Sequence, residues 1–489
     1  TRRPSDLTGP AGVTKSGTGT LVLSLPNIYE GQTTVSAGTL QIARRVSLYG
    51  GDTAQWNEAN ILVSSGASLA LNVGGPEEFT DDDLDLFNAL GSGTGGFLSG
   101  STWGFDTTSA TDGSFIYDAE IANPGGNARG LTKLGAGTLE LSGLNTYTGP
   151  TRLDSGTLSV SSLTNGGFAS GTGMSGPHRD NLVFAGGALR YTGPSTRTDR
   201  GFKYAVNTNF YTFDVTQPET VLTFGAITNA VFDGNNTTIK KTGPGTLVFA
   251  RGSGTVYNFP VKAIHVLGGK FTTETGNNNV QHNLHSLASQ GPALVLGDGA
   301  EMGFNNPLEN YVNGDEMMVQ YIGTQTGARV TAGNWLLCGP TTNSVGDRLY
   351  NTHIFDINDG ADDVDLDIQG MLGIYSSIAN SYVRKTGAGT LRLNSSSSTF
   401  RGTTIVRNGR LLVTANVPKG GNSVLGNCTN DVVIGDVALW RETTRPSPSK
   451  APPTVPSLSR AASPPMRQAA PLPSAASRTT SSPSAGRSC

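Results

Sequence analysis

The stretch LTKLGAGTLELSGLNTYTGPTRLDSGTLSV, residues 131–160, contains no histidine, no cysteine and only two acidic residues. Its aliphatic residues alternate with polar ones: Leu139 and Leu141 flank Glu140, and the same alternation recurs at residues 158–160. A period of two places the aliphatic side chains on one face of a strand and the polar ones on the other. The stretch therefore predicts short strands with one buried face.

Glycines separate these strands. Gly135 and Gly137 precede the strand that Thr138 begins, which indicates turn positions that need either a positive φ or a close backbone approach. Strands this short cannot bury an apolar face alone, so each must stack on an equivalent strand from a neighbouring turn of the chain.

The same pattern recurs along the chain, which indicates a repeat protein. Further strand motifs are interleaved with it, such as ILVSSGASLAL from Ile61 and FIYDAEI from Phe115. The four copies of the pattern lie near residues 12–43, 130–160, 239–271 and 383–413, and are anchored by Lys15, Lys133, Lys241 and Lys385.

We therefore predict an all-β fold, a right-handed parallel β-helix (solenoid) with loop insertions, over residues 12–440. Residues 1–11 are expected to be a lead-in or partial repeat. Residues 441–489 are rich in Pro and Ser and are expected to be a disordered low-complexity tail. The abrupt loss of the repeat after Trp440 indicates a reading-frame slip, and a genuine linker stalk is the alternative.

An asparagine and an aromatic residue recur inside the repeat. Asn145 and Tyr147 correspond to Asn27 and Tyr29 in the first copy, and more weakly to Phe400 in the last. The aromatic residue either covers a corner of the coil or stacks on a sugar. We favour the corner, because the residue lies inside the repeating packing unit.

The quoted pattern closely resembles the autotransporter-associated β-strand repeat, also called the passenger-associated transport repeat. The resemblance covers most of residues 12–440, although the centre of the motif is altered in the third and fourth copies. It implies an extracellular or bacterial cell-surface passenger whose repeats help it to fold and to cross the outer membrane. The translocator barrel that such a passenger needs is expected outside this chain.

One segment, EEFTDDDLDLFNALG at Glu77–Gly91, predicts a helix inserted into the solenoid. Thr80 can cap it, residues 81–83 favour its positive N-terminal end, and Gly91 ends it. The three aspartates could bind a cation, but we interpret them as a solvated first turn.

Three aspartates are the candidate metal ligands. Asp363, Asp365 and Asp367 alternate with aliphatic residues, so they are expected on the outer face of one strand. A structural calcium would suit them, and pectate-lyase-like enzymes place a catalytic metal on such carboxylate rows. Arg392 is expected to face outward one coil later, and we favour a solvated or Arg392-paired row over metal binding.

Other motifs carry little chemistry. GSGTGG at residues 91–96 and GTGMSG at 171–176 match a dinucleotide-binding spacing but lack its strand–loop–helix setting. Ser175, His178 and Asp180 are close in sequence, but catalytic triads are defined by geometry across a fold. We predict loops for the two glycine-rich segments and draw no catalytic role from the three neighbouring residues.

The remaining reactive residues are sparse. His282 and His285 have no evident further metal ligands, and Cys338, Cys428 and Cys489 are too far apart in sequence for a metal set or a dense disulfide framework. The net charge of −3 over 489 residues gives no case for nucleic acid as a partner, and no apolar run approaches the ~20 residues needed to span a bilayer.

The predicted function is that of a non-enzymatic, secreted or surface-exposed structural or adhesive protein, with no catalytic residues and no cofactor beyond a structural calcium. Its expected partners are surface glycans or host and cell-surface proteins. The alternative is a polysaccharide-binding or polysaccharide-cleaving β-helix, although no convergent acid and base set recurs in the sequence.

Overall fold

The computed structural model describes residues 7–205, 210–227, 230–232, 236–250, 257–274, 280–284, 291–304, 308–309, 316–332, 335–337, 351–374, 381–418 and 420–435. All of them belong to one compact unit, Thr1–Val437. The second unit, Ala438–Cys489, holds the predicted tail and lies outside the described residues, so the disorder predicted for residues 441–489 stays a prediction.

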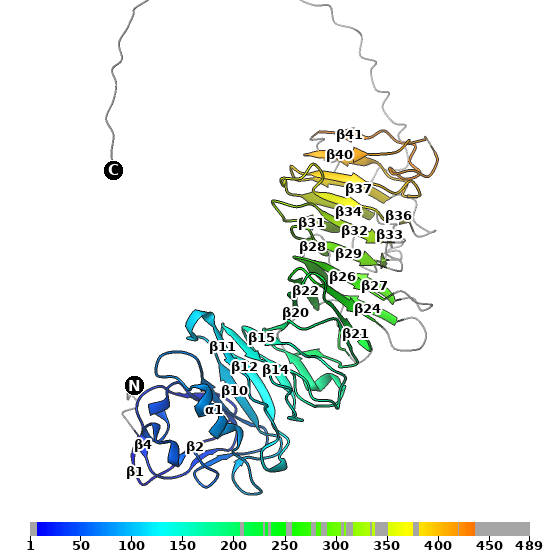
Figure 1. Ribbon diagram of the computed structural model, residues 1–489. Coiled ribbons are helices and arrows are strands. Elements are labelled where there is room, and N and C mark those ends of the chain that lie inside the picture. The colour runs from blue at the N-terminus through cyan, green and yellow to red at the C-terminus, as the bar shows by residue number, and fades with distance from the viewer. Residues whose placement is uncertain are drawn as a thin grey trace, which may run out of the picture. The chain divides into compact units, whose positions relative to one another are not determined.

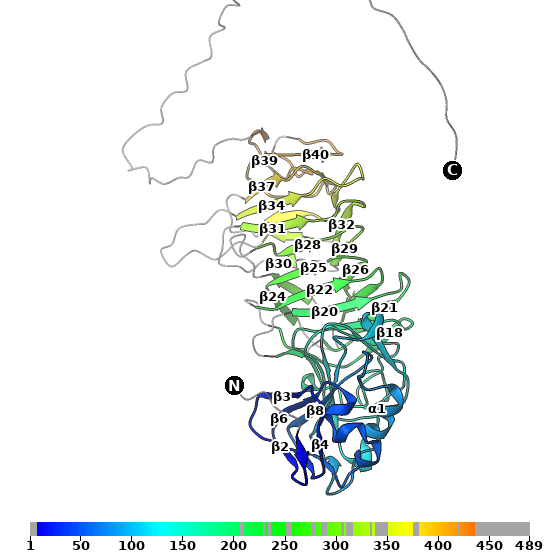
Figure 2. The same cartoon turned by 90° about the vertical axis from the view of Figure 1, so that its left-hand side faces the viewer.

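Within the described part of the chain, every pairing between named strands is parallel, and each strand inside a sheet pairs with strands of the preceding and following coils. The coils therefore stack as rungs (Figure 1). Figure 2 shows the rungs of one sheet from β20 to β39 lying above one another. The prediction of an all-β parallel β-helix is confirmed.

Two sheets cover the first coils, and a short strand pair accompanies them in the described residues. The pair is β1 (Thr8–Gly9) and β4 (Ile28–Tyr29). The four-stranded sheet contains β2 (Val13–Lys15), β5 (Thr33–Val35), β7 (Ile61–Val63) and β9 (Gly96–Phe97). The eight-stranded sheet contains β3 (Thr20–Leu23), β6 (Gly38–Ile42), β8 (Ala67–Asn72), β10 (Thr102–Asp106), β12 (Gly130–Leu134), β14 (Thr151–Leu153), β16 (Leu182–Phe184) and β19 (Lys203–Tyr204).

The longest sheet begins where the fourth coil gains a third strand, and it continues to the last described coil. In the described residues it has thirteen strands: β11 (Ser114–Tyr117), β13 (Thr138–Leu141), β15 (Thr157–Val160), β17 (Ala188–Tyr191), β20 (Phe210–Val215), β22 (Thr238–Thr242), β25 (Ala263–Val266), β28 (Leu294–Leu296), β31 (Glu316–Tyr321), β34 (Asn351–Ile357), β37 (Ser381–Thr386), β39 (Thr404–Val406) and β41 (Val433–Ile434).

Two further sheets complete the later coils. Among the described residues, the nine-stranded sheet contains β18 (Thr196–Thr198), β21 (Val221–Phe224), β23 (Thr246–Phe249), β26 (Lys270–Thr273), β29 (Glu301–Phe304), β32 (Ala328–Ala332), β35 (Leu366–Ile368), β38 (Thr390–Leu393) and β40 (Arg410–Val413). The five-stranded sheet, likewise as far as described, contains β24 (Tyr257–Val261), β27 (Val280–Leu284), β30 (Leu308–Glu309), β33 (Trp335–Leu337) and β36 (Leu372–Ile374).

The predicted strand faces are confirmed. Leu139 and Leu141 point into the solenoid and are at most 1% exposed, whereas Glu140 lies on the outer side. Gly135 has a φ of +73°. A Cβ on Gly137 would lie 2.5 Å from the Thr107 carbonyl oxygen of the preceding coil, which is the close approach expected there.

The predicted helix is shorter than expected, because α1 covers only Asp81–Asn88 of the predicted 77–91. Thr80 caps it as predicted, and Asp83 completes a capping box by accepting a hydrogen bond from the Thr80 N–H at 3.0 Å. Asp83 is buried and ion-paired with Arg45 at 2.7 Å, so the prediction of a fully solvated acidic turn is wrong at that residue. No described helix has the length and apolarity to cross a membrane.

Short 3-10 turns join several strands in the described chain. They are η1 (Arg45–Ser47), η2 (Tyr49–Gly51), η3 (Thr53–Gln55), η4 (Thr111–Gly113), η5 (Pro124–Gly126) and η6 (Arg179–Asn181).

Candidate functional site

The anchoring lysine of each repeat copy holds two coils together. Lys133 donates from Nζ to the carbonyl oxygens of Leu134, Gly135 at 2.9 Å and, one coil later, Ser155 at 3.4 Å. Each of the other three lysines likewise binds the carbonyls of the next two residues and one of the next coil. Those next-coil acceptors are Ala37 for Lys15, Gly268 for Lys241 and Asn408 for Lys385. We call this arrangement the lysine clamp.

A glycine of the following coil covers each clamp. Gly156 has a φ of +62°, and a Cβ there would lie 2.3 Å from the Gly137 carbonyl oxygen and 2.8 Å from Lys133 Nζ. The equivalent glycines in the other copies also have positive φ, and a Cβ on any of them would lie equally close to a carbonyl oxygen of the preceding coil. They are Gly38, Gly269 and Gly409.

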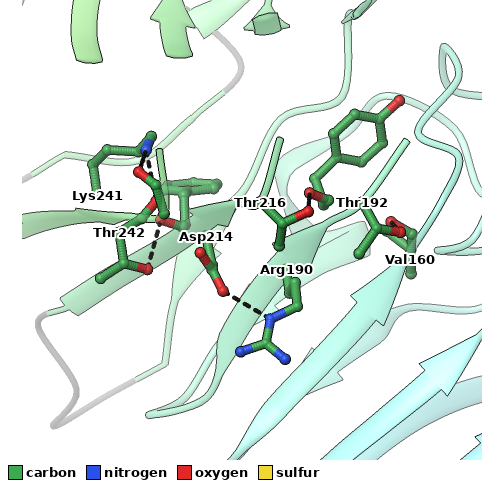
Figure 3. Close-up of polar contacts among 10 residues, drawn as sticks. Val160, Arg190, Thr192, Asp214, Thr216, Lys241 and Thr242 are labelled. Carbon is green, nitrogen blue, oxygen red and sulfur yellow. Dashed lines mark hydrogen bonds and ion pairs between the residues drawn. The ribbon is translucent and has the colours of Figure 1, made fainter. Parts of the chain in front are cut away.

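The clamp lysines are buried cations without an ion pair in the described residues. Burial lowers the pKa of Lys133, Lys241 and Lys385 to about 8, so the ammonium groups remain mostly charged at neutral pH. Three carbonyl acceptors match the three donors of an ammonium group. Figure 3 shows Lys241 beside Thr242, whose carbonyl is one of its acceptors. We therefore interpret these lysines as structural.

The recurring asparagine links three successive coils. Asn145 accepts a hydrogen bond from the Ile121 N–H of the coil before at 2.8 Å and donates to the Gly171 carbonyl of the coil after at 3.2 Å. Asn27 makes the equivalent bonds to Leu7 and Ser47. In the last copy, Ser398 replaces the asparagine and accepts from the Leu372 N–H.

The aromatic residue beside it is fully covered. Tyr147 is 0% exposed and its hydroxyl bonds Thr151 Oγ1 at 2.6 Å, as Tyr29 does with Thr33. Phe400 is also 0% exposed. The predicted corner role is confirmed, and sugar stacking is excluded for these rings because neither face is accessible.

The predicted row of three aspartates is wrong. Strand β35 begins only at Leu366, and Asp363 lies exposed in the turn before it. Asp365 is fully buried, and its carboxylate accepts hydrogen bonds from the Gly360 and Thr390 N–H groups, each at 2.6 Å. Both oxygens of Asp365 therefore stabilise a turn and the next coil.

Asp367 belongs to a ladder of alternating charge on the outer face of the nine-stranded sheet. Arg392 donates to both of its oxygens at 2.6 and 2.8 Å, which confirms the predicted pairing. Burial would raise the pKa of Asp367, but the hydrogen bonds from Arg392 and Gln369 outweigh it and hold the pKa below its usual range. The ladder residues in register are Lys270, Glu301, Arg329, Asp367 and Arg392. No group of three metal-ligating side chains occurs in the described chain.

The other predicted candidates do not assemble a catalytic set where they are described. Ser175 is buried and its Oγ accepts from Arg200 Nη1 at 3.3 Å, whereas His178 and Asp180 are exposed and 3.4 Å apart. Asp180 also pairs with Lys203 at 2.6 Å.

Both glycine-rich segments are loops, as predicted. Gly173 packs on the Tyr147 ring, and Gly91 forms an isolated antiparallel β-bridge with Gly96. The structure does not describe the side chain of His282. Three further candidates lie outside the described residues, namely His285, Cys338 and Cys489. The Cys428 thiol is free and donates to the Gly402 carbonyl at 3.1 Å.

Two buried arginines were missed by sequence reasoning. Arg129 donates to the Phe87 carbonyl at the C-terminus of α1 and packs over the Trp103 ring with a guanidinium-to-centroid distance of 4.6 Å. Arg200 donates to the Gly173 carbonyl at 2.8 Å and to four further residues of the 164–175 loop. Neither residue lies in the repeat pattern, so nothing in the sequence distinguished them from exposed arginines.

A groove crosses the outer face of the thirteen-stranded sheet from β20 to β31 and has a volume of about 600 Å³. Its floor follows one register row over five successive coils. That row is Thr212, Lys240, His265, Val295 and Gln320. Exposed Phe210 and Ile322 lie at its two ends along the solenoid axis. We call it the β20–β31 groove.

The carboxylates that adjoin this groove on the sheet are engaged. Asp214, beside Thr212 on β20, accepts from Arg190 Nε at 2.7 Å (Figure 3). Asp356, beside Gln320 in register, accepts hydrogen bonds from Gln320 and Thr386. A second depression of about 550 Å³ on the eight-stranded sheet is lined by charges that are already paired, namely Lys203 with Asp180 and Arg152 with Asp154.

Comparisons with known proteins match this architecture. The passenger-associated-transport-repeat family matches residues 13–42, 131–160 and 383–413. The third predicted copy, 239–271, is not among these matches, yet its Lys241 forms the same clamp.

The adhesin BmaC autotransporter of Brucella suis biovar 1 (strain 1330) is 34% identical over 249 residues, which is 50% of this chain. The chain spans only 7% of the length of that relative. No solved structure matches the chain. These findings indicate a surface-exposed or secreted protein. The stacked coils of the chain thus carry three segments that match the passenger-associated-transport-repeat family, and the lysine clamp is built in each of them, at Lys15, Lys133 and Lys385.

Proposed function

We propose that the chain is a non-enzymatic structural or adhesive passenger that acts by contact through the outer faces of its coils. The observation that carries the proposal is that the recurring residues of the repeat serve coil stacking, whereas the outward strand positions do not. The clamp lysine, the covering glycine and the asparagine corner all point between or into coils, where they stabilise stacking. The outward positions of the strands are thereby left to vary in chemistry. The relative named an adhesin supports a contact role.

The repeats in this proposal also support folding and passage across the outer membrane. Each clamp joins two adjacent coils, so an added coil can be fixed to the one before it without contacts to distant parts of the chain. Partners in this role would be surface glycans or proteins of other cells.

Adhesion can be measured with beads that carry the purified chain. We expect such beads to be retained on a monolayer of animal cells, whereas beads carrying albumin or the heat-unfolded chain are washed away. Equal retention of all three kinds of bead would argue against a contact role of the folded solenoid.

The alternative is a polysaccharide-cleaving β-helix, and the same preparation tests it. Turnover of acidic glycans, with or without calcium, that is lost in Asp363→Asn, Asp365→Asn or Asp367→Asn would establish an enzyme and contradict the proposal. We expect no turnover, because Asp365 and Asp367 are committed to backbone and arginine partners.

A further inference from the structure

The β20–β31 groove offers free polar groups on its floor, with apolar side chains around them. Lys240 and His265 are adjacent in register, and neither side chain has a hydrogen bond or ion pair within the described residues. Val295 continues the same row, and exposed Phe210 stands at one end with 52% of its surface accessible. A pocket with a mainly apolar lining and a few placed polar groups is the usual form of a ligand site.

The charge in the groove has one sign. Lys240 is the single charged residue among those that line it, as far as the chain is described. Burial, together with Lys240 and Lys262, lowers the pKa of His265 to about 4. The imidazole is therefore neutral at physiological pH and offers one donor and one acceptor. The adjoining carboxylates of Asp214 and Asp356 are held by Arg190, Gln320 and Thr386.

The dimensions suit an extended chain. Adjacent coils are about 4.8 Å apart, so the four steps from β20 to β31 span roughly 19 Å along the solenoid axis. The strands beneath the groove are interior members of the sheet, and their backbone groups already pair with both neighbours. A peptide could not add to the sheet as a strand here, which removes the main source of affinity for extended peptides.

From this geometry we infer that the β20–β31 groove binds an acidic oligosaccharide lying along the solenoid axis. Phe210 stacks on the apolar face of a sugar ring, the Lys240 ammonium binds a uronic-acid carboxylate, and His265 and Gln320 exchange hydrogen bonds with hydroxyl groups. This inference rests on the proposed contact function and names the class of ligand for one of its surfaces. We expect the groove to bind without hydrolysis, because none of its described lining residues is a carboxylate that could serve as the acid, base or nucleophile of glycoside hydrolysis.

Calorimetric titration of the full chain with oligogalacturonate tests the inference, with the carboxyl-reduced neutral oligosaccharide and polyglutamate as comparison ligands. We expect the acidic oligosaccharide to bind at least about tenfold more tightly than the reduced one. Lys240→Gln should weaken binding of the acidic ligand about tenfold and leave the neutral one unchanged, whereas Phe210→Ala should weaken both about tenfold.

Two variants outside the groove lining are matched controls. Lys262→Gln removes the same charge nearby, and Phe168→Ala removes a ring that is even more exposed than Phe210, so both should bind within about threefold of the unchanged chain. Thermal melts of all four variants should coincide, since each altered side chain lies at the surface.

Absence of oligogalacturonate binding, tight binding of polyglutamate through Lys240, or equal affinity of the groove variants would each overturn the inference. Bead adhesion separates this failure from that of the proposed function. Adhesion without saccharide binding leaves the contact role standing and ends the glycan assignment. Saccharide binding without adhesion supports the groove and contradicts the adhesive role.

Discussion

A few residue positions in each repeat make the side-chain contacts that join one coil to the next. The lysine needs three carbonyl acceptors, two from its own turn and one from the next coil, and the glycine above it keeps those carbonyls accessible. A side chain at that glycine would meet backbone atoms, which cannot move aside without breaking the stack. The repeat is therefore constrained by close packing around a buried charge.

Gly156→Ala tests this packing. We expect a loss of about 2–4 kcal/mol in the free energy of unfolding, from a Cβ placed against the Gly137 carbonyl in addition to the strain of a positive φ. Gly167→Ala is the matched control, since Gly167 has a φ of +86° and open space around its Cα, and should lose only about 1 kcal/mol. Urea unfolding followed by circular dichroism measures both, and equal losses would show that the close approach is unimportant.

At the scale of the strand, register decides what an outward side chain meets. Asp367 pairs with Arg392 of the coil above it, as the sequence predicted, and the parallel register also places Arg329 below it, which the sequence did not predict. The ladder that results neutralises each charge with its neighbours one coil away. Period two placed Asp367 on the outward face correctly but was wrong for Asp365, which lies buried in the turn before the strand.

Chelation and mutation distinguish this ladder from a calcium site. Treatment with EDTA should leave the thermal midpoint unchanged, because arginine and backbone donors already satisfy Asp367 and Asp365. Asp367→Asn should cost about 1–3 kcal/mol and lower the salt dependence of unfolding. A midpoint that falls with EDTA and recovers with added calcium would instead establish the metal site.

Acid should destabilise the solenoid through a histidine on an inward strand face. Burial lowers the pKa of His353 to about 3, whereas an unfolded histidine titrates near its ordinary 6.5. Between these values the unfolded state binds more protons, so stability falls as the pH falls, by about 2–3 kcal/mol from pH 7.5 to 4.5.

Urea midpoints measured over this pH range check the effect. His353→Met should reduce the loss of stability between pH 7.5 and 4.5, since methionine does not titrate. His178→Met replaces an exposed histidine and should leave that loss of stability unchanged. An unchanged loss of stability on acidification in His353→Met would mean that other groups control acid unfolding.

Over the whole described unit, the repeat copies are not in phase. The clamp lysine lies in the four-stranded sheet in the first copy, in the eight-stranded sheet in the second and in the thirteen-stranded sheet in the third and fourth. Strand β11 begins the thirteen-stranded sheet between the first and second copies, and strand β18 begins the nine-stranded sheet between the second and third, so each addition shifts the phase. Clamps of one kind therefore stabilise different faces of the solenoid.

Because each clamp joins only neighbouring coils, their contributions should add. We expect Lys133→Met and Lys241→Met each to cost about 2–4 kcal/mol, and the double variant to cost their sum within about 0.5 kcal/mol. Lys262→Met, at a lysine outside any clamp, should have little effect. Chemical unfolding gives all four values, and a much smaller loss for Lys241→Met would mean that the third copy is not an equivalent repeat.

The sequence by itself determined the parallel β-helix, the inward leucines such as Leu139, the turn glycines and the buried corner at Tyr147, because period two and internal repetition act locally and recur. The tertiary structure alone decided that Asp365 is buried, that Arg329 joins the charge ladder at Asp367, that Arg129 is buried against α1 and that Lys240 and His265 share a groove. Those outcomes depend on which strands stack and in what register. Strand pairing joins residues 19 to 38 positions apart, from Thr138 with Thr157 to Ala328 with Leu366, and no local sequence pattern fixes the length of the loops between them.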